Sequence, residues 1–177
     1  ALTAWFNPTI NSYKRINAPV TASGATWSPN TITYSGNNRT HMIRVPGPGR
    51  FELRLMDGAT NPYLLQAGIL AAGIDGIEKK RNPGKPINVN MYEDGYKVKG
   101  AKKLPLTLEK SLSHLNKSKV LKDAFGKETV NSYIKLKNRE INKYNSSKEK
   151  KIGFKGSKKG SKSNIITQWE KDNTLDC

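Results

Sequence analysis

Residues Arg50–Leu65 read RFELRLMDGATNPYLL, and within them a strand pattern gives way to helix signals. The first six residues alternate between charged and apolar side chains, which indicates a β-strand with one charged face. The charged side chains are Arg50, Glu52 and Arg54, and the apolar ones are Phe51, Leu53 and Leu55. Asn61 is a favourable helix N-cap, and Pro62 stands at the first helical position. The stretch therefore predicts a strand followed by a helix.

The residues on either side extend this pattern. Upstream, 30–35 (NTITYS) and 40–45 (THMIRV) are β-branched and alternating, so the first 60 residues are predicted as strands and tight loops. Pro46–Gly49 (PGPG) is a strong turn signal, and the strands that flank it are predicted to pair antiparallel. Downstream, the helix that begins at Pro62 is apolar on nearly all sides, which predicts that it is buried.

The second half of the chain is predicted to be helical after a long polar connection at residues 79–106. Leu108–Phe125 has a helical pattern and ends before Gly126, a favourable C-terminal cap. Lys127–Tyr144 is predicted to be an amphipathic helix. Its apolar stripe consists of Val130, Ile134, Ile141 and Tyr144.

The composition excludes several classes of protein. The 177 residues suit one domain, and 35% of them are hydrophobic. Polar and glycine residues interrupt the apolar stretch Leu64–Ile77, so no membrane span is predicted. Cys177 is the only cysteine, which excludes a disulfide framework. The first residues lack the charged and then apolar pattern of a secretory signal peptide, so we expect a cytoplasmic protein. The sequence starts with Ala1 and not with Met, so we expect a chain cut from a longer protein.

Positive charge is concentrated toward the C-terminal end. The net charge is +17, and Lys148–Lys162 contains seven lysines. This Lys/Gly/Ser-rich run predicts a mobile insertion at 148–163, between a domain at 1–147 and its C-terminal segment at 164–177. Two interpretations stay open: a solvated insertion, or a tail that binds nucleic acid or acidic membrane non-specifically through clustered cations. A phosphate loop is excluded because Ser161 separates Gly160 from Lys162.

Basic side chains also recur among the strands and turns of residues 7–54. They are Lys14, Arg15, Arg39, Arg44, Arg50 and Arg54. Two interpretations fit the charged face of the Arg50–Leu55 strand. It could be a solvated face with a cross-strand ion pair, or a polyanion site at which arginines bind phosphate and carboxylate while Glu52 holds a divalent cation. Arginine suits the second interpretation because its planar fork binds oxyanions through two hydrogen bonds.

Four blocks and the C-terminal residues resemble glutamine synthetases in their order and spacing. They are NPTINSYKR (Asn7–Arg15), GNNRTHMIRVP (Gly36–Pro46), RFELRLMDGATNPYLL (Arg50–Leu65), AAGIDGI (Ala71–Ile77) and QWEKDNTLDC (Gln168–Cys177). The resemblance is closest to the branch that includes glutamate–methylamine ligases. It implies an α+β fold, the C-terminal part of the glutamine synthetase catalytic domain, with an antiparallel curved sheet, packed helices and a helical C-terminal region.

The resemblance implies a role for each charged residue of these blocks. Arg15 and Arg54 would bind the glutamate substrate. Arg39 would be catalytic, because it would face the acyl phosphate and the phosphoryl group in transfer. These three residues would therefore act on the substrate side of the site.

The remaining implied roles concern ATP and a metal ion. Arg44 and Arg50 would bind the nucleotide, and Glu52 would bind Mg2+ or Mn2+. ATP would phosphorylate the glutamate γ-carboxylate, and ammonia would then attack the acyl phosphate. No enzyme nucleophile is needed for this reaction, and His41 and His114 are interpreted as ordinary packing or surface residues.

The sequence also departs from the family pattern. Between Ile16 and Trp27 it has no acidic residue, where many relatives carry a flap glutamate. The family's β-grasp domain and its other metal ligands lie upstream of these blocks, so we expect the isolated chain to be inactive. Two alternatives stay open: methylamine or another small amine as substrate, and a truncated chain that acts only by interaction or polyanion binding. By resemblance, a homo-oligomeric ring is expected. We expect no membrane partner, and no binding of nucleic acid other than non-specific binding through Lys148–Lys162.

Overall fold

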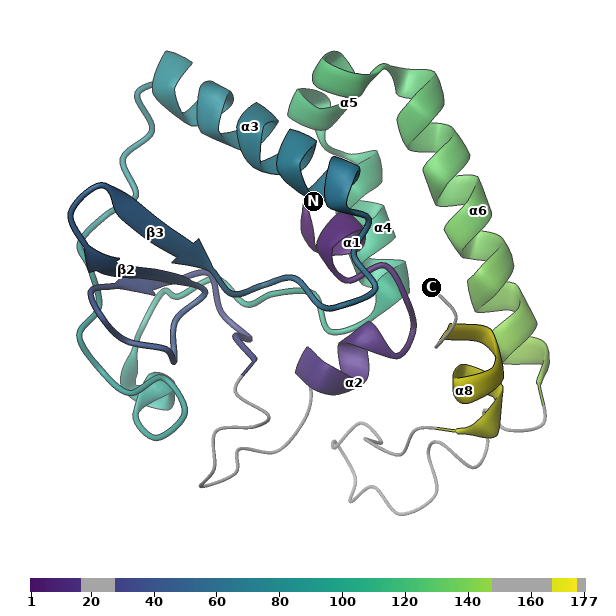
Figure 1. The fold of residues 1–177 in the computed structure, drawn as a ribbon, viewed down its shortest axis with the longest axis horizontal. Helices are drawn as coiled ribbons and strands as arrows, with labels where there is room; N and C mark the ends of the chain where they lie inside the picture. Colours follow the sequence, from purple (N-terminus) through teal and green to yellow (C-terminus); the bar gives the residue numbers. More distant parts are fainter. Residues whose placement is uncertain (17–27, 148–166, 175–177) are drawn as a thin grey trace.

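The computed structural model describes residues 1–16, 28–147 and 167–174, and these residues form an α+β fold (Figure 1). A small sheet lies at one side of the molecule, and helices make up the rest. The elements are α1 (Thr3–Phe6), α2 (Ser12–Ile16), β1 (Tyr34–Ser35), β2 (Ile43–Gly47), β3 (Arg50–Leu53), α3 (Pro62–Glu78), the 3-10 helix η1 (Gly95–Lys97), α4 (Leu108–Asn116), α5 (Lys119–Phe125), α6 (Lys127–Ser146) and α8 (Gln168–Thr174). The predicted fold class is confirmed.

The described sheet has three strands in the order β1-β2-β3. β2 and β3 pair antiparallel across the proline–glycine turn, as predicted, with Arg44 opposite Glu52. The register shifts between Arg44 and Gly47, and Gly49 completes the turn with a φ of 71°, a conformation that favours glycine. β1 pairs parallel to β2, so the expectation of a wholly antiparallel sheet is wrong at this strand, and residues 30–33 of the predicted strand lie outside β1.

The prediction that the first 60 residues contain only strands and loops is wrong, because α1 and α2 lie there. Both helices are too short to show a helical period in the sequence. Tertiary contacts stabilise α1 instead. The Trp5 ring is buried and makes edge-to-face contacts with Phe125 and Tyr133, with centroids 4.9 and 6.3 Å apart.

The main core lies between α1, α4 and α6. Leu112, Leu115, Val130 and Ile141 are buried there, which confirms the predicted apolar stripe of α6. The predicted helix Leu108–Phe125 is divided in two. The first helix, α4, ends at Asn116, and Ser118 caps the start of α5. Gly126 ends α5 as predicted, and its φ of 82° is one that side-chain-bearing residues rarely adopt.

α3 begins at the predicted cap, where the Asn61 side chain accepts hydrogen bonds from the backbone of Tyr63 and Leu64 at 3.0 and 3.1 Å. The prediction that this helix is buried is wrong: Gly68 is its only buried residue, and Leu70 is 64% exposed. α1 and α5 cover one side of the helix, and the described residues leave its other apolar sides to solvent. Gly68 lies on the covered side, where a Cβ atom would be 2.9 Å from the Leu2 side chain.

Residues 79–106 form a connection along the sheet and contain η1 as their one helical turn. The Ile87 backbone N–H donates to the carbonyl of Tyr34 at 3.0 Å, and Leu104 donates to Asn30 at 2.8 Å. Most of this segment is exposed, as predicted, yet it supplies residues that lie beside the strands.

Two further expectations have different outcomes. The lysine run at 148–162, with the insertion boundaries drawn around it, lies outside the described residues. Within the described part of the chain, no helix combines the length and the apolar character needed to cross a membrane.

Candidate active site

The charged face of the β2–β3 pair is organised around Glu52, whose carboxylate bridges two arginines. Arg44 donates from Nη1 to Oε2 at 2.6 Å, and Arg54 donates from Nε to Oε1 at 3.1 Å. The Glu52 side chain is 43% exposed, whereas the arginine side chains are 14% and 15% exposed. The cross-strand ion pair of the first interpretation is therefore present, and it holds two guanidinium groups on one side of the sheet.

Local geometry explains why these three side chains meet. Arg44 is the cross-strand partner of Glu52, and Arg54 lies two residues along, on the same side of the pleat. Asn37 supports Arg44 from the other side, because its Oδ1 accepts from Arg44 Nε at 2.8 Å. The hydrogen bond and charge of Arg44, together with the charge of Arg54, hold the pKa of Glu52 below its ordinary value, so the carboxylate is ionised at neutral pH.

Arg15 reaches the same region from α2. Its Nη2 donates to the Leu55 carbonyl at 2.5 Å and to Asn7 Oδ1 at 3.1 Å. Its Nε–H is buried and has no hydrogen-bond partner within the part of the chain that the structure describes. Burial lowers the pKa of Arg15, and the neighbouring charge of Arg54 acts in the same direction, whereas Asp57 opposes both. Arg15 and Arg54 therefore lie within electrostatic reach of each other, and the Asp57 carboxylate offsets the effect of Arg54 on Arg15.

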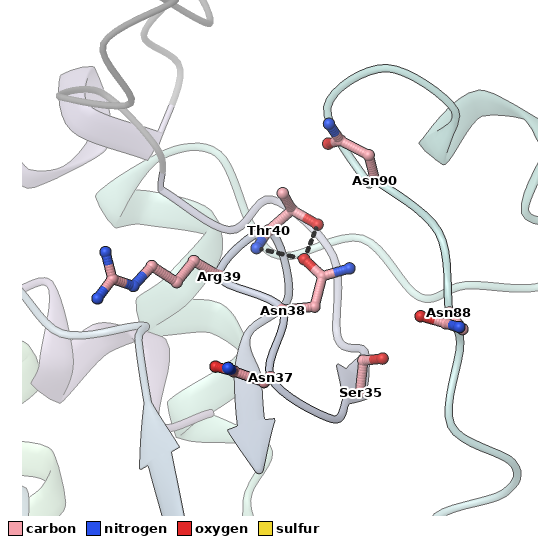
Figure 2. A pocket seen from close by; sticks show the side chains of 7 residues that line it. All are labelled: Ser35, Asn37, Asn38, Arg39, Thr40, Asn88 and Asn90. Carbon is pink, nitrogen blue, oxygen red and sulfur yellow. Dashed lines mark hydrogen bonds between the residues drawn. The ribbon is translucent and has the colours of Figure 1, made fainter. Parts of the chain in front are cut away.

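Arg39 lines a polar cavity of about 490 Å³, which borders this cluster through Asn37, the partner of Arg44. The cavity is lined by Ser35, Asn37, Asn38, Arg39, Thr40, Asn88 and Asn90. Figure 2 shows the Arg39 side chain pointing away from Asn88 and Asn90, which stand on the facing loop. Asn38 shapes the loop before β2, because its Oδ1 accepts from the Thr40 backbone and hydroxyl at 2.9 and 2.7 Å.

Three of the six predicted site residues are joined by direct contacts, Arg44, Glu52 and Arg54, and Arg15 lies within electrostatic reach of Arg54. Of the other two, Arg39 is exposed beside the cavity, and Arg50 is exposed at the first position of β3. The ion pairs of the Glu52 carboxylate are with Arg44 and Arg54, so the alternation that placed Arg50 on this face does not bring Arg50 into the ion-pair cluster.

A divalent cation would find one suitable ligand among the predicted residues. Glu52 offers an ionised, half-exposed carboxylate of the kind that Mg2+ and Mn2+ prefer. Among the described residues, no group of three or more His, Cys, Asp or Glu side chains is close enough to hold a metal ion. The Glu52 carboxylate is chemically suited to serve as one metal ligand, and the described residues form no cluster of three such ligands around it.

Sequence reasoning missed several residues that support the site. Asn7 and Asn37 orient Arg15 and Arg44 through their side-chain oxygens. Tyr92 lies near both Arg15 and Arg54, and burial raises its pKa to about 12. The blocks that contain the two asparagines were recognised, but only their charged residues carried a chemical signal. His41 is buried and contacts Thr33 and Val89, in agreement with a packing role.

Comparisons with known proteins agree on one family. The family model "Glutamine synthetase, catalytic domain" matches residues 1–152. The chain is 53% identical to the glutamine synthetase of Rhizobium meliloti (strain 1021) over 176 residues, which are 99% of this chain and 36% of that protein. It is 44% identical to the glutamate–methylamine ligase of Methyloversatilis universalis over 147 residues, 81% of this chain and 33% of that protein.

Solved structures show the same relationship. A GmaS in complex with ADP matches 99% of this chain with a TM-score of 0.77 and 49% identity, and the match covers 36% of that structure. The glutamine synthetase of Plasmodium falciparum matches 82% of this chain, and 36% of its own, with a TM-score of 0.63 and 27% identity. The chain therefore spans about a third of the length of the relatives it matches.

Proposed function

The chain belongs to the glutamine synthetase family through its catalytic domain, and from this premise we propose that it is part of an ATP-dependent glutamate–amine ligase. The proposed reaction joins ammonia to the γ-carboxylate of glutamate through an acyl phosphate. One observation of this structure carries the proposal: the ionised Glu52 carboxylate holds the partly buried guanidiniums of Arg44 and Arg54 on one side of the sheet. A surface of this kind is suited to a substrate that bears carboxylates and phosphates.

Glutamate binding is assigned to Arg15 and Arg54. The buried Nε–H of Arg15 has no hydrogen-bond partner among the described residues, and Arg15 lies within electrostatic reach of Arg54. A substrate carboxylate placed between them would accept hydrogen bonds from both and offset their mutual repulsion. The attachment of Arg15 to the Leu55 carbonyl fixes its guanidinium before substrate arrives.

The other three arginines are assigned to phosphoryl transfer. A γ-carboxylate oxygen of glutamate attacks the terminal phosphorus of ATP, and ADP leaves. Arg39, Arg44 and Arg50 would offset the negative charge that is spread over the transferring group and the nucleotide phosphates. A divalent cation, bound in part by Glu52, would supply further charge neutralisation. The amine nitrogen then attacks the acyl carbon, and phosphate leaves with the carboxylate oxygen that it received.

Methylamine is the second candidate for the amine. The 44% identity to a glutamate–methylamine ligase and the TM-score of 0.77 to GmaS favour this substrate. The absence of an acidic residue between Ile16 and Trp27 agrees with it, because a flap carboxylate would help to deprotonate ammonium. The higher identity to the Rhizobium meliloti glutamine synthetase favours ammonia, which we retain as the first candidate.

The experiment that tests this function uses an extended ligase, which we define as this chain joined to the part of the Rhizobium meliloti relative that it does not match. Phosphate release is measured with ATP, Mg2+ and glutamate, first with ammonium and then with methylamine. We expect release to require both glutamate and an amine, with ammonium the better substrate. Phosphate release that ignores glutamate would refute the ligase, and a preference for methylamine would select the second candidate.

We also propose that the ligase assembles as a homo-oligomeric ring in the cytoplasm, as the family resemblance implies. Light scattering of the extended ligase tests this assembly. A monomer that retains full ligase activity would contradict it.

A further inference from the structure

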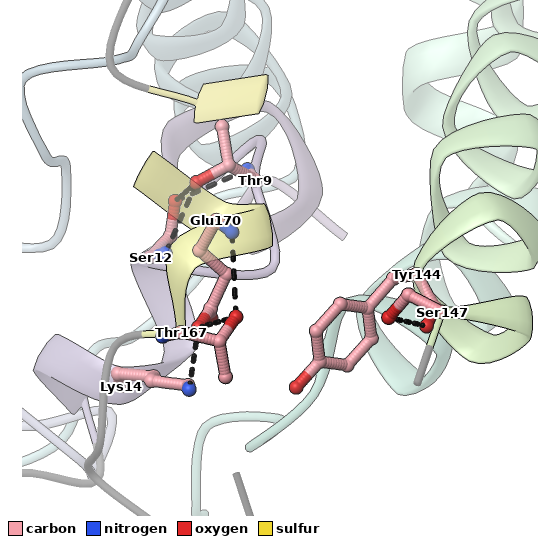
Figure 3. Close-up of polar contacts among 7 residues, drawn as sticks. All are labelled: Thr9, Ser12, Lys14, Tyr144, Ser147, Thr167 and Glu170. Atoms are coloured by element: carbon pink, nitrogen blue, oxygen red, sulfur yellow. Dashed lines mark hydrogen bonds and ion pairs between the residues drawn. The ribbon is translucent and has the colours of Figure 1, made fainter. Parts of the chain in front are cut away.

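A buried ion pair joins the first and last described segments of the chain. Lys14 in α2 donates from Nζ to Oε2 of Glu170 in α8 at 2.7 Å. The Glu170 side chain is fully buried, and the Lys14 side chain is 12% exposed. Figure 3 shows α8 beside α2, with Lys14 pointing to the Glu170 carboxylate. The pair lies outside the charged cluster on the sheet.

The carboxylate of Glu170 is held in place by its own helix. Its Oε2 accepts from the Thr167 backbone N–H at 2.7 Å and from the Thr167 hydroxyl at 3.0 Å. In return, the Glu170 backbone N–H donates to Thr167 Oγ1 at 3.3 Å. This reciprocal arrangement is a capping box, which fixes the first turn of α8. α8 is itself attached to α6, because Trp169 makes an edge-to-face contact with Tyr144 at a centroid distance of 5.1 Å.

The ion pair acts on the helix that carries Arg15. Lys14 and Arg15 are consecutive residues of α2, and they bind on different sides of it: Lys14 contacts α8, and Arg15 contacts the Leu55 carbonyl after β3. Ser12 and Thr9 fix the start of α2, because the backbone N–H of each donates to the side-chain oxygen of the other at 3.1 Å. A helix of five residues has little rigidity of its own, so these contacts set its orientation.

We propose that Glu170 is a positioning residue, which fixes α2 through Lys14 and thereby sets the direction in which Arg15 meets a substrate carboxylate. The proposal rests on the proposed function for the role of Arg15. A buried ion pair is weak evidence for stability, because desolvation of the two charges offsets their attraction, but it defines one geometry. An error of about 1 Å at a binding group can cost on the order of 100-fold in rate.

The test compares three variants of the full 177-residue chain with the unsubstituted chain. Glu170→Gln removes the carboxylate charge that faces Lys14. The double variant Lys14→Met/Glu170→Gln also removes the ammonium, so neither charge is left buried without its partner. Asp172→Asn is the matched control, because Asp172 is exposed on the same helix and accepts a hydrogen bond from the neighbouring Gln168 side chain. Hydrogen exchange of the α2 amides and the NMR signal of Arg15 Nε–H are measured, and L-glutamate is then titrated into each chain.

We expect Glu170→Gln to destabilise the chain and the double variant to recover its stability. In both, α2 amides should exchange faster, the Arg15 signal should shift or broaden, and glutamate binding should weaken on the order of 10-fold. The control should behave like the unsubstituted chain. If the double variant does not differ from the unsubstituted chain in stability, in α2 amide exchange, in the Arg15 signal or in glutamate binding, Glu170 has no positioning role.

A different result would identify failure of the proposed function. If the unsubstituted chain shows no response to glutamate at Arg15, the carboxylate-binding role of Arg15 is wrong. The α2 exchange and the ligand-free Arg15 signal then decide the positioning role, because neither needs substrate. Unchanged exchange and an unchanged signal in both Glu170 variants would overturn it.

Discussion

Replacement of Glu52 by Gln separates the two interpretations of the charged strand face. The amide keeps the shape of the side chain and loses the charge that Arg44 and Arg54 share. Because the Glu52 side chain is 43% exposed, solvent screens both ion pairs, and we expect the free energy of unfolding at neutral pH to fall by only about 1 kcal/mol. Such a small effect is all that a solvated sheet face would show.

The loss of stability should depend on pH in a defined direction. The pKa of Glu52 in the folded chain lies below its ordinary value of 4.5 because of Arg44 and Arg54. The carboxylate therefore contributes stability above pH 4.5 and loses that contribution as the pH falls through the lower, folded-state pKa. Unfolding of both chains by urea should show a difference at neutral pH that disappears in acid.

Activity gives the decisive readout for Glu52. In the extended ligase, loss of a metal-binding carboxylate should lower the rate on the order of 100-fold or more, as at other preorganised charged sites. The concentration of Mg2+ or Mn2+ that gives half the maximal rate should rise, because the amide has no charge to hold a hard cation. The assay is phosphate release against metal concentration for both proteins. An unchanged metal midpoint and rate would exclude Glu52 from the site and leave the strand as scaffold.

Four further outcomes are expected. The 177-residue chain alone should release no phosphate from ATP with glutamate and ammonium, since Glu52 is the only assigned metal ligand; turnover above ~1 s⁻¹, within the ordinary enzyme range, would contradict this. Deletion of Lys148–Lys162 should leave the circular dichroism spectrum unchanged and weaken heparin retention with a smaller salt dependence, and unchanged retention would place polyanion binding elsewhere. Leu115→Ala should lower the free energy of unfolding in urea by about 2–5 kcal/mol because Leu115 is fully buried, whereas Asn61→Ala should cost about 1 kcal/mol through loss of the α3 cap.

The parts of the fold that were predicted correctly depend on local signals. The PGPG turn and the alternation after it identify an antiparallel pair, and Asn61 with Pro62 marks the first turn of α3. These features depend on neighbouring residues, so a single sequence contains them. The helical stripe of α6 is long enough to show its period.

The errors concern features that depend on distant contacts. α1 and α2 have four and five residues and form because residues such as Trp5 are buried against other helices. α3 carries apolar residues on all sides. This composition shows that the helix could be buried on any side, but it does not show which sides the neighbouring elements cover. Hydrophobic periodicity identifies a face but does not supply its partner.

The candidate site shows the same division. Alternation along one strand placed Glu52 and Arg54 on one side, and the structure confirms it. The contact of Arg44 with Glu52 depends on the register between strands, and Arg15 arrives from a helix far away in the sequence. The family resemblance selected all of these residues, but their mutual geometry required the folded chain.

The central claim is that this family member joins an amine to glutamate through an acyl phosphate. The most direct measurement uses the extended ligase with glutamate whose γ-carboxylate oxygens are labelled with ¹⁸O, together with ATP and ammonium. If the acyl phosphate forms, one labelled oxygen leaves with each phosphate released and the other stays in the product amide. Mass spectrometry of the phosphate should therefore show one ¹⁸O per molecule. Phosphate released without label would contradict the acyl phosphate and the roles assigned to the arginines around Glu52.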